Sequence, residues 1–139
     1  VIQSRLGPGR IHHCMRCIGV GEMALLRVVH RANHRRIFGT LLKDKELFLT
    51  AYAQFKIDIE RCRLLVLNAA HKIDLAGAKG AMREIAIAKI ETPRTVLKIL
   101  DWGIQMFGAE GVSQDTELAR DYALNRTLEK GQSKSWRWV

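Results

Sequence analysis

Hydrophobic positions along most of this chain recur at intervals of three and four, which is the spacing of one face of an α-helix. The clearest stripe lies between residues 48 and 73 and consists of Phe48, Tyr52, Phe55, Ile59, Cys62, Val66, Ala69 and Ile73. We expect this stripe to face the core. Four further apolar residues widen it and predict a helix that packs on more than one side. They are Leu47, Ala51, Leu65 and Leu67.

Three more segments share this periodicity. We expect helices over residues 11–29, 81–107 and about 113–128, in addition to the one that carries the stripe. A turn is expected at Gly7-Pro8-Gly9, before the first helix. Gly39 fits the position just past the end of that helix, and the glycines at 77–80 should end the second. Ser113 or Asp115 is the expected N-cap of the last helix.

No segment shows the polar and apolar alternation of a strand bounded by turns. Four helices joined by short loops predict an all-α fold, namely an antiparallel four-helix bundle. The length of 139 residues suits one domain, which we place at residues 1–128. Residues 129–139, with Trp136 and Trp138, lose the helical pattern and are interpreted as a divergent tail.

The net charge is +9, and the excess of Lys and Arg lies in the first hundred residues. A basic balance favours an anionic partner, such as nucleic acid, a phosphorylated cofactor or an acidic surface. Three cysteines are an odd and sparse set, which indicates a reduced, intracellular protein. No apolar run reaches the roughly 18 residues that a membrane span needs. The chain starts at Val1 rather than Met, which we interpret as a processed product or a fragment.

Cys14 and Cys17 have the spacing of a metal-binding knuckle, and His12 and His13 precede them. The cysteines fall inside a helical pattern, however, and no second pair with this spacing follows. A helical pair of cysteines is therefore the favoured interpretation, and no metal site is predicted.

His30 and His34 lie one helical turn apart, but no Glu follows His30 as a zinc-protease motif would require. We interpret them as part of a solvated basic face. The chain has no phosphate-binding glycine motif and no Ser nucleophile motif, and nothing in it looks like a nucleophile beside its base. We therefore name no catalytic residue.

Two loops remain as candidate binding sites. Arg35 and Arg36 end the first helix and Phe38 follows, a set that can clamp a phosphate and stack on a ring. The alternative is a solvated charge run with a core Phe. In the second loop, Gln105-x-x-Gly108-x-x-Gly111, glycines let a ligand approach the backbone closely. The alternative there is a plain helix C-cap.

Taken together, Arg35-x-x-Phe38-Gly39 and Gln105-x-x-Gly108-x-x-Gly111 resemble the C-terminal helical domain of the acyl-CoA dehydrogenases. Between them, Glu60-x-x-Arg63 and Ala86-x-Ala88-Lys89 fit the same family. The segments 6–16 and 111–116 look closest to the branch that handles long or unusual acyl chains. The resemblance covers about residues 5–128 and rests on several motifs that agree in order and distance.

The resemblance implies what the two loops bind. In this family FAD lies between the helical bundle and a preceding β-domain, and the bundle of a neighbouring subunit completes the site. Arg35 matches the arginine that contacts the FAD pyrophosphate, and Phe38 follows as a ring contact. Gln105, Gly108 and Gly111 match the segment that lines the same cofactor.

The resemblance also implies a reaction. Arg10 matches a position near the acyl-CoA channel. In the family a carboxylate removes the α-proton of an acyl-CoA thioester while a hydride passes from its β-carbon to the flavin. The partners implied are acyl-CoA and either further copies of the chain or a related subunit, and the location implied is the mitochondrion or the peroxisome.

The chain departs from the family pattern after Gly108. Ala109 replaces a second glycine and Glu110 puts a carboxylate beside an anionic cofactor, so both should weaken cofactor binding. The position of the family's catalytic carboxylate is Gln132 here, and a Gln side chain cannot take a proton. Glu129, three residues earlier, is a poor substitute.

We therefore expect a fragment or a splice-altered form of the enzyme, with part of an FAD surface and no general base, which is inactive alone. A second interpretation is a helical interaction or dimerisation module without a cofactor. A third, a nucleic-acid binder, has only the charge in its favour, because few aromatics accompany the basic residues and no recognised nucleic-acid motif occurs.

Overall fold

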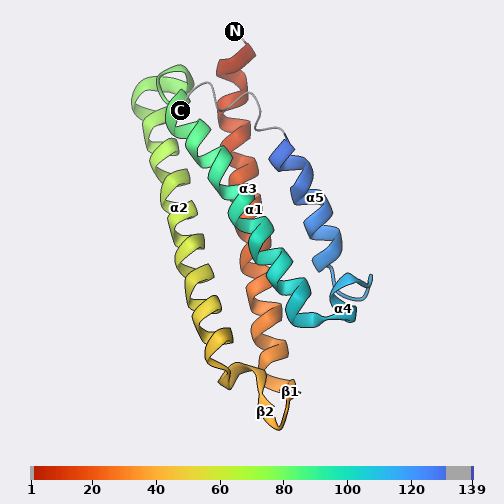
Figure 1. The fold of residues 1–139 in the computed structure, drawn as a ribbon. Helices are drawn as coiled ribbons and strands as arrows, with labels where there is room; N and C mark the ends of the chain where they lie inside the picture. The colour runs from red at the N-terminus through yellow and green to blue at the C-terminus, as the bar shows by residue number, and fades with distance from the viewer. Residues whose placement is uncertain (1, 131–138) are drawn as a thin grey trace.

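The computed structural model of the protein describes residues 2–130 and 139, and it is built almost entirely from helices (Figure 1). The elements are α1 (Ile2–His34), β1 (Arg36–Ile37), β2 (Thr40–Leu41), the 3-10 helix η1 (Leu42–Asp44), α2 (Glu46–Gly80), α3 (Met82–Phe107), α4 (Ala109–Val112) and α5 (Leu118–Lys130). Helices α1, α2, α3 and α5 alternate in direction along the chain. The predicted all-α, antiparallel four-helix arrangement is confirmed.

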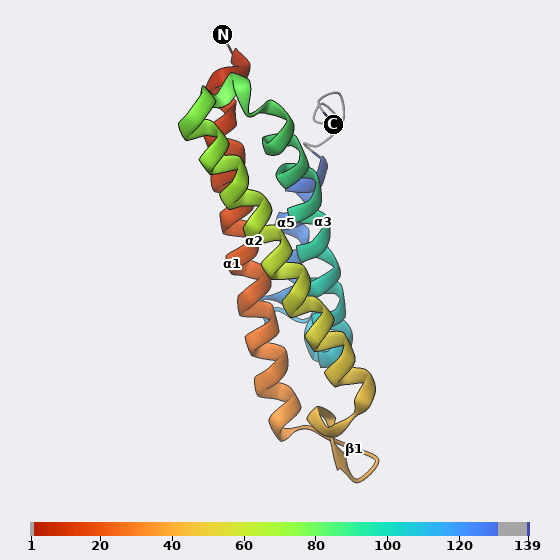
Figure 2. The ribbon, with the colours of Figure 1, turned by 90° about the vertical axis from the view of Figure 1, so that its left-hand side faces the viewer.

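Helix α3 occupies the middle of the bundle and contacts α1, α2, α4 and α5. Helix α2 lies on one side of the α1–α3 pair and α5 lies on the other (Figures 1 and 2). The reason is that α3 buries apolar residues on more than one side: Ile85, Ala88, Ile90, Val96, Leu97, Ile99 and Leu100. Its expected range of 81–107 is confirmed to within one residue.

The three long helices meet closely at Gly21 of α1. A Cβ atom placed there would lie 2.9 Å from Cδ1 of Ile59 and 3.3 Å from Cγ2 of Val96. Ile59 and Val96 belong to α2 and α3 and are fully buried. The absence of a side chain at residue 21 therefore lets both neighbours pack directly against the α1 backbone.

Helix α2 packs on one side only, which corrects the expectation of a wider buried face. Its stripe is buried at Phe48, Ile59, Cys62, Val66 and Ala69. Two of the expected flanking residues are exposed, Leu47 at 88% and Leu67 at 54%, whereas Ala51 and Leu65 are half-buried. Among the long helices α2 contacts chiefly α1 and α3.

The first helix is longer than expected, and the turn predicted at Gly7-Pro8-Gly9 is wrong. Helix α1 begins at Ile2 and runs through Pro8 to His34. A Cβ atom on Gly7 would lie 2.9 Å from Cβ of Ala78. This glycine therefore serves a close approach between α1 and the end of α2 rather than a turn.

A hairpin follows α1 and corrects the expectation that the chain has no strands. Strands β1 and β2 pair antiparallel, with Arg36 opposite Leu41 and Ile37 opposite Thr40. The loop between them is Phe38 and Gly39, with φ of 51° and 83°. Positive φ at both positions matches the two-residue turn that follows the twist of a hairpin. Gly39 is thus a hairpin residue and not a helix cap.

The last helix starts later than expected. Helix α5 begins at Leu118, so neither Ser113 nor Asp115 is its N-cap. The Ser113 hydroxyl instead accepts a hydrogen bond from the Asp115 backbone N–H at 3.2 Å and donates to the Glu110 carbonyl at 2.7 Å. Three residues of the expected divergent tail lie outside the described residues, namely Gln132, Trp136 and Trp138.

Over the part that the structure describes, no helix combines the length and the apolar character required to cross a bilayer.

Replacing Ile59 with Ala should lower the free energy of unfolding by about 3 kcal/mol, because it removes buried methyl groups and leaves a cavity. Leu47→Ala, in the same helix but 88% exposed, should change it by less than about 0.5 kcal/mol. Chemical denaturation followed by circular dichroism measures both values. Comparable losses in the two variants would contradict the one-sided packing of α2.

Candidate functional site

The hairpin presents Arg35 and Phe38 to solvent. The Arg35 backbone is held on both sides: its N–H donates to the Arg31 carbonyl at 2.8 Å, and its carbonyl accepts from the Leu42 N–H at 2.8 Å. Its side chain is exposed. Phe38 is 97% exposed, so the alternative of a core Phe is wrong.

Phe38 is also held in an unusual backbone conformation. Its φ of 51° lies in the left-handed region, which a bulky side chain adopts only at a cost of about 1–3 kcal/mol. The backbone of Phe38 is strained and its ring is almost fully exposed, so this residue contributes nothing to the core. Residues of this kind concentrate at ligand-binding sites, where the strain presets the geometry.

The second loop begins at the end of α3. Gln105 is exposed on the last turn, and Gly108 ends the helix with φ of 65°. The Gly108 N–H donates to the carbonyls of Ile104 and Gln105 at 3.0 and 3.2 Å. The helix C-cap interpretation is therefore confirmed, and it coexists with open space: nothing lies within 4 Å of a Cβ placed on Gly108.

Gly111 has the opposite environment. A Cβ atom there would lie 2.5 Å from the carbonyl oxygen of Ile104 and 3.0 Å from Cβ of Phe107. Its N–H donates to the Gly108 carbonyl at 2.9 Å. The short helix α4 is therefore folded back onto the last turn of α3, and only glycine fits between them.

Arg31, a basic residue near the first loop in the sequence, joins the two loops, and this link was not predicted. Its guanidinium donates to the carbonyls of Met106 and Phe107, both at 3.0 Å, and ion-pairs with Glu110 at 2.6 Å. It also lies over the Phe107 ring, 4.6 Å from the ring centroid. Since Arg31 is one helical turn before Arg35, the α1 end that leads into the hairpin is fastened to the glycine loop.

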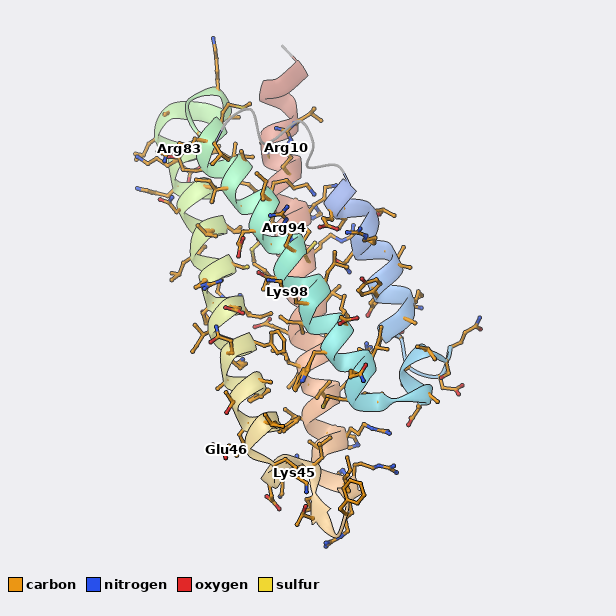
Figure 3. The ribbon with its side chains drawn as sticks, viewed as in Figure 1. Arg10, Lys45, Glu46, Arg83, Arg94 and Lys98 are labelled. Atoms are coloured by element: carbon orange, nitrogen blue, oxygen red, sulfur yellow. The ribbon has the colours of Figure 1, made fainter. Side chains whose placement is uncertain are left out.

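Arg10 lies far from these residues. It is 24 positions before His34, the last residue of the same helix, which corresponds to about 36 Å at the rise of an α-helix. Figure 3 shows Arg10 toward the N-terminal end of the bundle and Lys45 at the opposite end. The structure thus gathers Arg35, Phe38, Gln105, Gly108 and Gly111 at one end and places Arg10 toward the other.

The surface around the hairpin is basic. Arg36 and Lys43 are exposed there, and the rings of His30 and His34 lie 4.8 Å apart on the exposed side of α1. Nδ1 of His34 is 2.8 Å from the His30 carbonyl oxygen. The interpretation of the histidines as a solvated basic face is confirmed. This surface suits an anionic ligand.

The cysteines belong to the core. Cys14, Cys17 and Cys62 are each 1% exposed and none is in a disulfide. Burial raises the pKa of all three thiols, that of Cys14 to about 12, which makes them poor nucleophiles. Across residues 2–130 and 139, no group of three or more His, Cys, Asp or Glu is arranged to hold a metal ion.

Two charged residues near the end of α5 are occupied by structural contacts. Lys89 is 7% exposed and donates from Nζ to the Leu128 carbonyl at 3.1 Å. Glu129 forms an ion pair with Arg126 one turn earlier. The position expected for a catalytic carboxylate, Gln132, lies outside the described residues.

Comparison with known proteins supports one family. The model of the acyl-CoA dehydrogenase C-terminal domain matches residues 1–133. Acyl-CoA dehydrogenase family member 11 from Homo sapiens is 49% identical over 128 residues, which cover 92% of this chain and 16% of that protein.

Solved structures agree with this match. A Mycobacterium abscessus protein assigned to the acyl-CoA dehydrogenases superimposes with a TM-score of 0.90 at 34% identity and covers 96% of this chain and 34% of its own. Butyryl-CoA dehydrogenase from Megasphaera elsdenii gives 0.81 at 26% identity, covering 91% and 34%. The chain thus spans about a sixth of the human relative's length and about a third of these two structures.

Gly111→Ala should destabilise the protein by about 1–3 kcal/mol, because the added methyl group meets the Ile104 carbonyl oxygen and forces α4 away from α3. Gly9→Ala, in α1 with nothing within 4 Å of the new Cβ, should instead stabilise by up to about 1 kcal/mol through helix propensity. Thermal unfolding measures both. A Gly111→Ala protein as stable as its parent would contradict the close contact.

Proposed function

This chain belongs to the acyl-CoA dehydrogenase family as its C-terminal domain, and from that premise we propose that it carries the bundle half of an FAD site. Arg35 would bind the pyrophosphate, Phe38 would contact a ring, and Gln105, Gly108 and Gly111 would line the same cofactor. These residues gather at one end of the bundle, two of them in positive-φ turns.

The residues present fit such a group. FAD offers an anionic pyrophosphate and planar rings, and the hairpin offers an exposed guanidinium beside an exposed aromatic side chain. A side chain at residue 108 would occupy the open space above the glycine loop, whereas Gly108 leaves it free. The observation that carries the proposal is Phe38, strained at φ 51° and 97% exposed, next to Arg35 at the entrance of the hairpin.

The chemistry that FAD supplies in this family is acceptance of a hydride during α,β-dehydrogenation of an acyl-CoA thioester. The part of this chain is to bind and orient: Arg35 would hold negative charge, and Gly108 leaves the backbone of the glycine loop accessible, whereas Gly111 is buried against α3. We name no catalytic residue here. Gln132 has an amide that cannot take the α-proton, and the Glu129 carboxylate is engaged by Arg126.

This chain spans only part of its relatives. Dehydrogenation of an acyl-CoA would therefore need groups that this chain does not supply. We propose that the chain alone is inactive and acts through a second copy or a related subunit that contributes the rest of the FAD site. Arg10 would lie near the acyl-CoA channel of such an assembly. The long or unusual acyl chain and the mitochondrial or peroxisomal location stay predictions from the family resemblance.

A second candidate function is a helical interaction module without a cofactor. It is favoured by the outer face of α2, where Leu64 and Leu75 are 64% and 69% exposed. A groove of about 550 Å³ between α2 and α3 is lined by Leu64, Leu65, Ile87 and Ile90 and also by Val139 of the same chain. Exposed apolar surface of this kind marks association sites. A concentration-dependent mass with no FAD binding would favour this function.

Titration of the purified chain with FAD should show saturable quenching of flavin fluorescence, and Arg35→Ala should weaken the affinity by about tenfold. The reason is the loss of a charge-assisted hydrogen bond to phosphate, which contributes roughly 1.5–3 kcal/mol. Isothermal calorimetry of the same samples provides a second readout.

Arg83→Ala is the matched control, because Arg83 is an exposed arginine on α3 at the opposite end of the bundle (Figure 3). It should bind FAD as the parent does. Equal losses in the two variants would mean that general positive charge, rather than the hairpin, attracts the cofactor. No binding by the parent protein would rule out an FAD half-site that works in the isolated chain.

The chain mixed with FAD, an acyl-CoA and an electron-accepting dye should reduce no dye above background, because the residue that matches the family's catalytic carboxylate is Gln132, whose amide cannot take the α-proton. The Gln132→Glu variant places a carboxylate at the position that the family uses for its base, and therefore tests whether the missing base alone explains the lack of turnover. Turnover by the unmodified chain would overturn the proposal that it is inactive alone.

A further inference from the structure

Arg31 makes more contacts to the glycine loop than any residue that the family resemblance points to. Its Nε and one terminal nitrogen donate to the last two carbonyls of α3, those of Met106 and Phe107. Its other terminal nitrogen is 2.6 Å from the Glu110 carboxylate, and its guanidinium stacks on the Phe107 ring. The Arg31 side chain is 19% exposed and its bonds to the two carbonyls are partly buried, whereas the Glu110 side chain is 50% exposed.

The end of α3 needs such a partner. The last four carbonyls of a helix have no partner within the helix, and the helix dipole concentrates negative charge there. Helix α3 has no basic residue in its own last turn. Arg31, on the last turn of α1, therefore supplies from another helix the cation that α3 lacks.

Arg31 also changes the electrostatic effect that Glu110 would have on an anionic cofactor. A carboxylate in the glycine loop would repel an anionic cofactor, and an unpaired one would weaken its binding. Here that carboxylate ion-pairs with a guanidinium which is itself fixed by two backbone carbonyls and an aromatic ring. The negative charge is thus compensated locally, and the carboxylate is held toward α1.

We propose that Arg31 is the positioning residue of the cofactor loop: it orders Gly108–Gly111 against the end of α1 and offsets the charge of Glu110. The charge-compensating part rests on the proposed FAD half-site. The ordering part does not, because it concerns contacts within this chain alone.

Amide hydrogen exchange without any cofactor tests the ordering. Arg31→Gln should speed exchange at Gly108 and Gly111 by about tenfold, because the loop loses its anchor while α1 and α2 keep their protection. Arg63→Gln is the matched control: Arg63 is also partly buried and ion-pairs with Glu22 across two helices, but far from this loop. Unchanged exchange in Arg31→Gln, or equal acceleration in both variants, would overturn the ordering.

A double-mutant cycle in FAD affinity tests the compensation. Arg31→Gln should weaken binding by about tenfold while Glu110 is present, and by less than about threefold in the Glu110→Gln background. Arg31→Lys keeps the charge without the paired donors, so it should restore most of the affinity but not the slow exchange. Equal losses in both backgrounds would show that Arg31 does not act through Glu110 and would overturn the compensation.

The two measurements separate failures of different origin. If the parent chain binds no FAD, the proposed half-site and the charge compensation that rests on it both fail, while the exchange data still decide whether Arg31 orders the loop. If the parent binds FAD and the cycle shows no coupling, the half-site stands and only the role of Arg31 toward Glu110 is wrong.

Discussion

Helix α3 contacts every other helix of the bundle, and more than half of its residues are buried when the chain folds. Burial of this kind is the main favourable contribution to the stability of a small domain. It also constrains the neighbours, which must approach a single rod from different sides. Small residues mark these approaches: Gly103 of α3 faces Leu118 and Val28, with a Cβ atom there 3.4 and 3.5 Å from their methyl carbons. The candidate site lies at the end of α3, so its position depends on this packing.

The long helices could be predicted from sequence because their apolar stripes repeat over many turns. Features set by one or two residues could be predicted only in part. Gly7, Gly39 and Gly108 are all glycines, yet they serve a close helix contact, a hairpin turn and a helix end, and only the helix end was predicted correctly. The strands β1 and β2 have two residues each, which is too short for any alternation to show. The exposure of Leu47 depends on which elements the rest of the chain leaves beside α2, and no local pattern carries that information.

The candidate site shows the same division. Its loops were identified by motif residues near each other in sequence, and the backbone at Phe38 and Gly108 agrees with special conformations there. The role of Arg31 was not predicted, because it depends on hydrogen bonds to carbonyls that lie 75 and 76 positions away in the sequence. Glu110 was weighed as an isolated charge for the same reason. The ion pair between Arg31 and Glu110 joins two distant elements, and it changes the electrostatic effect of Glu110 in a way that the sequence alone does not show.

Helix α5 is joined to the molecule less firmly than the others. It has 13 residues, of which Leu118 and Asn125 are buried, and it contacts chiefly α3. Elements with little burial open first in native proteins, at a free energy below that of global unfolding. We therefore expect α5 to open before the three long helices do, although Arg27 of α1 also ion-pairs with Asp121 of α5. Arg35, Phe38, Gln105 and Gly108 all lie outside α5, so opening of that helix would leave the elements that carry them in place.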